Sequence, residues 1–143
     1  PVGMAYAERI LARGAGLQGE RFAYGPDPYQ SLTVFRPAAP TGEVLVFLHG
    51  GGWTSGYQEW MFFMAPALLA QGITFVSAGY RLAPQHLFPA GLEDSADAVA
   101  WTVRHIAAHG GDPARVFVGG HSAGGHYAAL LGAPAAWRQA SWI

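Results

Sequence analysis

The sequence predicts an α/β protein in which helices cover both faces of a mostly parallel sheet. Short apolar runs alternate along the chain with longer segments in which apolar residues recur at helical spacing. The apolar runs are hydrophobic at nearly every position, which is typical of strands buried on both faces of a parallel sheet. The chain has 143 residues, of which 51% are hydrophobic, and we expect a single domain over residues 1–143.

The order of the elements follows from these patterns. Strands are predicted at residues 21–24, 32–35, 43–48, 73–78 and 116–118. Helices are predicted at residues 4–13, 59–70, 90–108 and 123–131. Gly25-Pro26-Asp27-Pro28 reads as a turn between the first two strands, and Gly72 is placed to cap the second helix at its C-terminus.

A Gly-x-Ser-x-Gly motif, Gly120 to Gly124, lies between the last strand and the last helix. In a strand–turn–helix context this motif indicates a nucleophile elbow, a sharp turn that lifts the hydroxyl of Ser122 clear of the backbone. Small residues two before and two after the serine let strand and helix approach closely. The alternative is an ordinary glycine-rich turn between a strand and a helix. Ser122 is the candidate nucleophile.

A second glycine-rich loop follows the strand at 43–48 and reads His49-Gly50-Gly51-Gly52-Trp53. Consecutive glycines allow backbone N–H groups to turn toward a developing oxyanion with no Cβ in the way. A phosphate-binding loop is the alternative. It would require a Lys followed by Ser or Thr, and the chain contains no lysine.

Four segments together resemble the hormone-sensitive-lipase-like branch of the α/β-hydrolases. They are His49 to Trp53, Tyr80-Arg81-Leu82-Ala83-Pro84, Phe88-Pro89-Ala90 and Gly120 to Gly125. His121 and His126, which flank the elbow, are more similar to kynurenine formamidase and feruloyl-esterase-like relatives. The resemblance covers roughly residues 30–132. It implies an α/β-hydrolase fold with Ser122 as catalytic nucleophile and the N–H groups of Gly51, Gly52 and Ala123 as the oxyanion hole, without cofactor or metal.

The two other members of the expected catalytic triad have no position in this sequence. In this fold the order is Ser, then Asp or Glu, then His. Only 21 residues follow Ser122, none of them is Asp or Glu, and His126 is the one histidine. Four residues after Ser122, its ring is expected to lie beside the helix rather than to meet the hydroxyl. We therefore expect the N-terminal portion of a longer hydrolase, with the fold truncated after the helix behind the elbow.

Two further groups of residues are candidates for support of the site. Asp94 precedes the serine and lies on a helix, so we interpret it, with Glu93, as a structural partner of Arg81 that holds the loop at 80–84. Four aromatic residues follow the oxyanion loop, and either line an acyl or alcohol pocket or pack in the core. They are Trp53, Tyr57, Trp60 and Phe62.

Composition excludes several classes of partner. The formal net charge is −1 and the eight arginines are scattered, so nothing indicates binding to nucleic acid or to an acidic membrane. There is no cysteine, which excludes disulfides and mildly favours a cytoplasmic location. No signal-peptide pattern and no apolar run of ~20 residues is visible. No His/Cys cluster suggests a metal site.

We therefore predict a serine hydrolase that cleaves a small carboxylic ester through an acyl-enzyme. Two alternatives stay open: an arylformamidase-like amide hydrolase, and a catalytically silent fragment or binding module. Self-association is a further expectation, because a chain that ends after the elbow helix would leave the strand at 116–118 at an apolar sheet edge.

Overall fold

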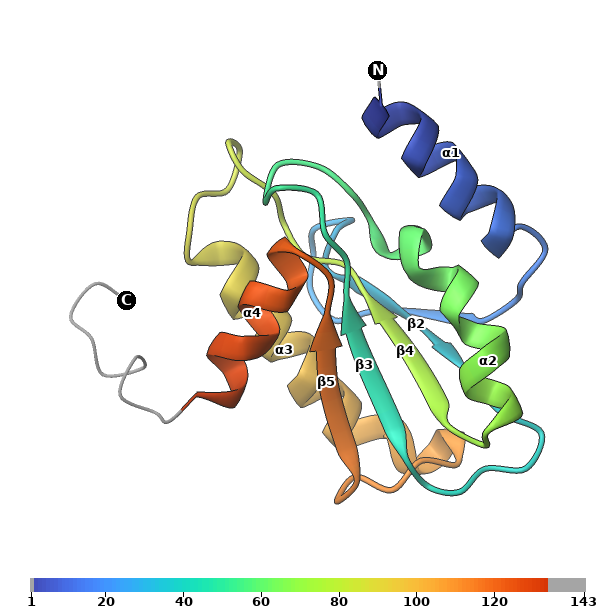
Figure 1. Ribbon diagram of the computed structural model, residues 1–143. Helices are drawn as coiled ribbons and strands as arrows, with labels where there is room; N and C mark the ends of the chain where they lie inside the picture. Colours follow the sequence, from blue (N-terminus) through green and yellow to red (C-terminus); the bar gives the residue numbers. More distant parts are fainter. Residues whose placement is uncertain (1, 134–143) are drawn as a thin grey trace.

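The computed structural model describes residues 2–133, and in it helices lie on both sides of one twisted sheet (Figure 1). The strands are β1 (Glu20–Ala23), β2 (Ser31–Phe35), β3 (Val44–Leu48), β4 (Thr74–Ala78) and β5 (Val116–Gly120). The helices are α1 (Val2–Gly14), α2 (Ala65–Ala70), α3 (Ala90–His105) and α4 (Ala123–Gly132), and two 3₁₀ segments are η1 (Gln58–Met64) and η2 (Ile106–His109). The predicted α/β class, with its α/β-hydrolase-like alternation of strands and helices, is confirmed.

The five strands lie in the order β1-β2-β4-β3-β5. Strands β4, β3 and β5 run parallel, whereas β1 pairs with β2, and β2 with β4, in antiparallel fashion. A short connection explains the first reversal, since strands joined by a tight turn can only pair antiparallel, whereas parallel neighbours need a long crossover. The parallel part therefore holds β3, β4 and β5, and their carboxyl ends meet at one edge of the sheet.

Alternate side chains of the strands fill two separate cores. Val44, Val46 and Leu48 of β3 pack toward α3 and α4, where they meet residues such as Leu92 and Tyr127. The opposite face carries a second cluster, which joins α1, η1 and α2 to the sheet: Ile10, Phe35, Met61, Ala65 and Phe75. Because both faces are covered, β3 is apolar at every position, as the sequence pattern predicted, whereas β4 also buries the hydroxyl side chains of Thr74 and Ser77.

The second predicted helix, at 59–70, is divided in the structure into η1 and α2. Pro66 lies in the first turn of α2, where its missing N–H would have no partner in any case. A continuous α-helix would instead need that N–H for a bond to the preceding turn. At the other end Gly72 adopts φ 76°, and the N–H groups of Gly72 and Ile73 donate to the carbonyls of Leu69 and Leu68. The expected glycine cap is thus present.

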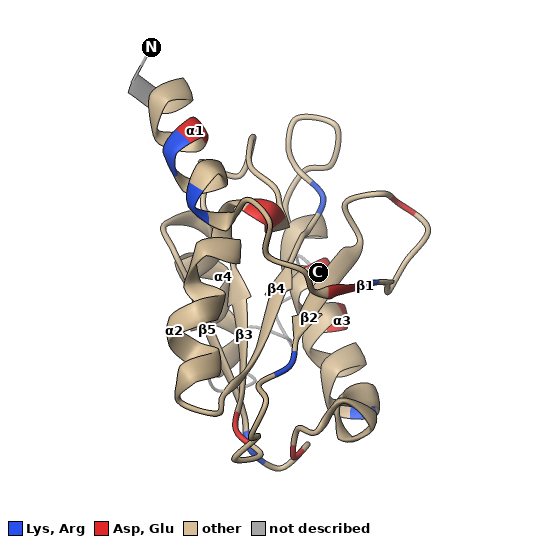
Figure 2. Cartoon of the chain, turned by 90° about the vertical axis from the view of Figure 1, so that its right-hand side faces the viewer, with Lys and Arg blue, Asp and Glu red and all other residues tan. Residues whose placement is uncertain are grey.

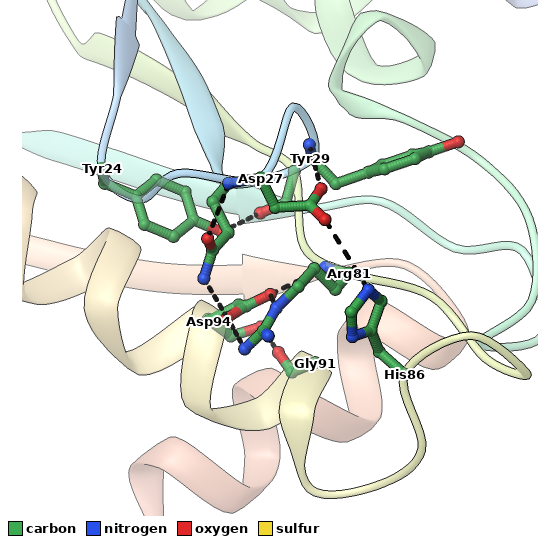
Figure 3. Close-up of polar contacts among 10 residues, drawn as sticks. Tyr24, Asp27, Tyr29, Arg81, His86, Gly91 and Asp94 are labelled. Atoms are coloured by element: carbon green, nitrogen blue, oxygen red, sulfur yellow. Dashed lines mark hydrogen bonds and ion pairs between the residues drawn. The ribbon is translucent and has the colours of Figure 1, made fainter.

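A buried ion pair joins the loop after β4 to helix α3 (Figure 3). Asp94 is fully buried and accepts bonds of 2.8 Å from both Nε and Nη2 of Arg81. The backbone N–H of Arg81 and the Gln30 amide complete the shell of this carboxylate at 2.9 and 2.8 Å. The structural partnership predicted for Asp94 is confirmed. Glu93 is exposed and its contribution is weaker: it forms no hydrogen bond with Arg81 among the described residues, and its negative charge acts through space, where it helps to raise the pKa of Arg81.

Charged residues are otherwise spread over several elements, with no run of one sign (Figure 2). Two exposed pairs, Arg21–Glu59 and Arg115–Glu43, lie at 2.8 and 2.6 Å. Within residues 2–133 none of the helices is both long and apolar enough to cross a membrane.

We expect Asp94→Ala to lower the free energy of unfolding by about 3–5 kcal/mol, because it leaves the Arg81 guanidinium and the Gln30 amide without their partner in a buried site. Glu43→Ala, which breaks the exposed pair with Arg115, should cost at most about 1 kcal/mol. Urea unfolding of the two variants measures the difference. Equal losses would mean that the buried pair does not stabilise the fold in the way described.

Candidate active site

Three loops meet at the carboxyl edge of the parallel strands, which is where α/β sheets usually bind ligands. The loop after β3 begins at His49, the loop after β4 begins at Gly79, and the turn after β5 holds His121 and Ser122. Both predicted catalytic motifs therefore lie at the same edge.

Ser122 lies on the turn between β5 and α4 with φ 51° and ψ −116°. Among the residues described, it is one of only two non-glycine residues with positive φ; the other is Trp53. Such a conformation costs about 1–3 kcal/mol and persists where the surrounding structure imposes it. The side chain is exposed. The elbow conformation expected from the motif is thus found.

Two glycines make this turn sterically possible. A Cβ on Gly124 would lie 2.1 Å from the Leu48 carbonyl oxygen, and one on Gly120 would lie 2.3 Å from the carbonyl of Gly124. These are distances that real Cβ atoms do not reach. The first turn of α4 therefore rests directly on the backbone at the end of β3, so the elbow and the glycine-rich loop are held together by main-chain contact.

His49 is fully buried at the start of the glycine-rich loop. Its ring stacks on Tyr80, with ring centroids 4.3 Å apart and an angle of 7° between the planes. Burial lowers the pKa of His49 to about 4. The ring is therefore neutral at ordinary pH, and because Nδ1 lies 2.7 Å from the carbonyl oxygen of Gly50, it is Nδ1 that carries the proton and donates.

Three successive carbonyls of this loop are held by neutral donors. The Tyr80 hydroxyl donates to the His49 carbonyl at 2.5 Å, and His49 Nδ1 holds that of Gly50. The carbonyl of Gly51 accepts from both the N–H and the hydroxyl of Ser55, at 3.0 and 2.8 Å. The sequence analysis named Tyr80 only as part of a family-like segment, without this role, and did not identify Ser55. A backbone carbonyl can be held by many residue types, so the sequence carries little signal for its partner.

These bonds determine the direction of the neighbouring N–H groups. In a planar trans peptide the C=O and the next N–H point in opposite directions. The N–H groups of Gly50, Gly51 and Gly52 therefore point away from the donors that hold the carbonyls. Within residues 2–133 none of these N–H groups, nor that of Ala123, donates a hydrogen bond. A Cβ on Gly50 would lie 3.1 Å from Ser122 Cβ, so the loop lies directly beside the serine.

No described residue forms a hydrogen bond with the Ser122 hydroxyl. The ring of His126 lies edge-on to Trp53, with centroids 5.6 Å apart, and it does not pair with the serine. This agrees with the expectation that His126 lies beside the helix. Within residues 2–133 the geometry supplies a candidate nucleophile and candidate oxyanion donors, but no general base at hydrogen-bond distance.

The four aromatic residues after the glycine-rich loop divide between the two roles considered for them. Trp60 and Phe62 pack on the core between the sheet and α1. Trp53 and Tyr57 are exposed and line separate cavities at the carboxyl edge.

A family model described as the alpha/beta hydrolase fold matches residues 45–141, about two thirds of the chain. The chain belongs to this family. The match includes the glycine-rich loop and the elbow, and it agrees with the resemblance to hormone-sensitive-lipase-like enzymes.

Several curated relatives of this α/β-hydrolase chain are esterases. It is 46% identical over 90 residues to the carboxylesterase NlhH of Mycobacterium tuberculosis, covering 62% of this chain and 28% of that protein. Esterase LipC of the same organism is 39% identical over 117 residues, or 78% and 29% of the two chains. A probable isoprenylcysteine alpha-carbonyl methylesterase of Oryza sativa is 36% identical over 108 residues, 74% of this chain and 25% of that protein.

Solved structures show the same likeness. A thermophilic esterase from Thermogutta terrifontis with butyrate bound has a TM-score of 0.71 and 30% identity, and covers 78% of this chain and 43% of its own. An inhibited esterase B from Lactobacillus rhamnosis has a TM-score of 0.77 and 27% identity, with 91% and 46% covered. The chain spans less than a third of the length of these curated relatives and less than half of these solved chains.

We expect Gly124→Ala to destabilise the hydrolase fold by about 3 kcal/mol, because its Cβ would overlap the Leu48 carbonyl and neither backbone segment can retreat. The matched control is Gly132→Ala in the same helix, where nothing lies within 4 Å of the new Cβ. Thermal and urea unfolding compare them. A tolerated Gly124→Ala would contradict the backbone contact between α4 and β3.

Protonation of His49 should destabilise the fold at acid pH. Its pKa is about 4 in the folded chain against 6.5 for the free side chain, so its contribution to stability is complete above pH 6.5 and is lost as the pH falls toward 4. The loss should reach about 3 kcal/mol. Urea unfolding measures the free energy of unfolding across this pH range. It should depend less on pH in His49→Asn than in the unaltered protein, because the asparagine side chain does not titrate. An imidazole NMR titration with a midpoint near 6.5 would refute the assignment.

Proposed function

We propose that the protein is a carboxylic ester hydrolase in which Ser122 is the nucleophile and the N–H groups of Gly51, Gly52 and Ala123 bind the oxyanion. The observation that carries the proposal is the pairing of two features. An exposed serine occupies a strained turn, and beside it the N–H groups of Gly50 to Gly52 have no acceptor within residues 2–133. Strain of this kind in a non-glycine residue is typical of functional sites.

The chemistry follows the acyl-transfer pattern. Ser122 Oγ forms a bond to the ester carbonyl carbon, and the carbonyl oxygen becomes an oxyanion that the three N–H groups stabilise. Collapse of this intermediate breaks the bond to the alcohol oxygen and leaves an acyl-serine, which water then hydrolyses. The serine proton has to pass to a general base and on to the leaving alcohol. We assign neither this base nor its acidic partner to any residue in 2–133.

The glycine-rich loop supplies donors that are fixed before the reaction begins. Because Tyr80, His49 and Ser55 already hold the carbonyls, the N–H groups need not reorient as charge develops. Preorganised donors of this kind account for a large share of enzymatic rate enhancement. The neutral state of His49 matters here, because a protonated ring would be a buried charge without a counter-ion.

The relatives favour an ester over an amide substrate. The relatives described above include a carboxylesterase, an esterase and a probable methylesterase, and one similar structure holds butyrate. No feature of the described residues points specifically to amide cleavage. We therefore propose that the substrate is a small carboxylic ester.

Hydrolysis of p-nitrophenyl butyrate tests the proposal. We expect turnover by the protein and its loss in Ser122→Ala, whereas Thr41→Ala, which removes a hydroxyl before β3 at the opposite end of the sheet, should retain it. Turnover that survives Ser122→Ala would refute the nucleophile. A serine that reacts once with an alkylphosphonate p-nitrophenyl ester but does not turn over would support the catalytically silent alternative.

Tyr80→Phe should lower kcat with little change in KM, because the ring stack on His49 remains while the bond to the His49 carbonyl is lost. Removal of a whole oxyanion donor lowers kcat by about 10²–10³. Tyr80→Phe leaves every donor in place and only frees the peptide between His49 and Gly50, so kcat should fall by about tenfold. Tyr24→Phe is the control, since that buried hydroxyl also donates to a backbone carbonyl, of Gly79, at 2.7 Å. Equal kinetic effects in both variants would indicate general destabilisation instead.

A further inference from the structure

Two buried nitrogen atoms on neighbouring rings beside the glycine-rich loop have no hydrogen-bond partner among the described residues. They are Nε2 of His49 and Nε1 of Trp60. The centroids of the two rings lie 6.4 Å apart, with an angle of 67° between the planes. Buried polar atoms in native proteins nearly always have a partner, because an unpaired one keeps the full cost of its lost hydration. The two atoms therefore need one explanation.

The two nitrogens are opposite in hydrogen-bonding character. Nδ1 of His49 carries the proton of the neutral ring, so Nε2 is an acceptor, whereas an indole nitrogen can only donate. Two other buried side-chain atoms in the described part of the chain also lack a partner: Thr74 Oγ1, at the start of β4, and His109 Nδ1, in η2. Trp60 and His49 differ from these because donor and acceptor lie on rings in contact.

Both rings are held by further contacts. The ring of Trp60 lies 5.6 Å from that of Tyr57, and it meets Tyr6 of α1 edge-on at 6.5 Å. His49 is held in turn by its stack on Tyr80, with centroids 4.3 Å apart. Neither ring is free to swing toward the other, so the space between the two nitrogens is more easily bridged than closed.

A single water molecule can join these nitrogens. Trp60 and His49 do not bond each other directly. A water with two hydrogen bonds of about 2.7–3.2 Å joins atoms up to about 6 Å apart, and buried waters usually pair polar groups that would otherwise stay unsatisfied. We propose that one buried water accepts the N–H of Trp60 and donates to Nε2 of His49, which makes Trp60 a positioning residue for the glycine-rich loop.

The bridge determines which nitrogen of His49 carries the proton. A donor at Nε2 requires that this nitrogen stay bare, so the proton remains on Nδ1 and holds the Gly50 carbonyl. The peptide that contains this carbonyl also contains the N–H of Gly51, one of the proposed oxyanion donors. The titratable group that stacks on the His49 ring is Tyr80, which stays neutral because burial raises its pKa. Trp60 therefore acts on the oxyanion loop through neutral groups.

An isosteric analogue separates the effect of the Trp60 N–H from that of its ring. β-(3-Benzothienyl)alanine, placed at position 60 alone, keeps the shape of tryptophan with sulfur where the N–H was. The same replacement of Trp101, whose ring packs on Phe22 in the other core, is the matched control.

Imidazole ¹H–¹⁵N NMR reports the tautomer and the titration midpoint of His49. We expect the Nδ1–H tautomer in the unaltered protein and in the Trp101 control. The position-60 analogue should shift the Nε2 resonance toward that of a bare acceptor and raise the midpoint by about half a unit to one unit, because a bond to the neutral ring is lost. An unchanged Nε2 resonance and midpoint would overturn the inference.

Water-selective NOE spectroscopy detects the bridge itself. We expect a cross-peak between a bound water and the indole N–H of Trp60, and slow exchange of that hydrogen with solvent. A scalar coupling between the indole nitrogen and His49 Nε2 would show a direct bond instead. Either that coupling or the absence of the water cross-peak would overturn the inference.

The effect on the reaction rests on the proposed function and is measured with p-nitrophenyl butyrate. The position-60 analogue should lower kcat about threefold with KM unchanged, because every oxyanion donor stays in place while one peptide is held less firmly. The Trp101 control should match the unaltered protein. Equal kcat in all three proteins would overturn the positioning role of Trp60. A protein that shows the water and the shifted midpoint but hydrolyses no ester would refute the proposed function and leave the bridge standing.

Discussion

The direct contact between the start of α4 and the end of β3 is the constraint on which the rest of the site depends. Gly124 has no side chain, so its backbone touches the carbonyls of Leu48 and His49, and any Cβ would push the helix away. This contact places the turn that carries Ser122 beside the loop that begins at His49. The strained conformation of the serine and the direction of the loop N–H groups are thus consequences of the same close packing of main chain.

Much of the fold was predictable because it depends on local pattern. Every predicted strand and helix is present, and the Arg81–Asp94 pair was inferred from charge and order along the chain. The division of the second helix was missed, although Pro66 marks it, because the apolar pattern runs through both parts without a break. Glu93 acts on Arg81 only through space, whereas Asp94 binds it directly, since adjacent residues on a helix point in different directions.

The two motifs of the candidate site could be predicted from the sequence. The residues that hold those motifs in place could not. The glycines can be recognised in the sequence because few other residues allow their backbone geometry, and their spacing marks the serine between them. Tyr80 and Ser55 act on backbone carbonyls, and which residue reaches a given carbonyl is decided by the tertiary fold. The same holds for Gln30, which reaches Asp94 across 64 residues of sequence. Trp53 is a different case, since nothing in its residue type suggests a left-handed backbone.

The four hydrogen bonds that hold the three carbonyls of the glycine-rich loop contain no ionised group. Tyr80 and Ser55 donate through hydroxyl and N–H groups, and His49 donates from a neutral ring. Dissolved salt weakens exposed ion pairs such as Arg115–Glu43 because mobile ions screen them. It has no comparable effect on hydrogen bonds between neutral groups. The shape of the loop should therefore be the same in dilute buffer and in concentrated brine, and any dependence of the protein on ionic strength must originate elsewhere in the chain.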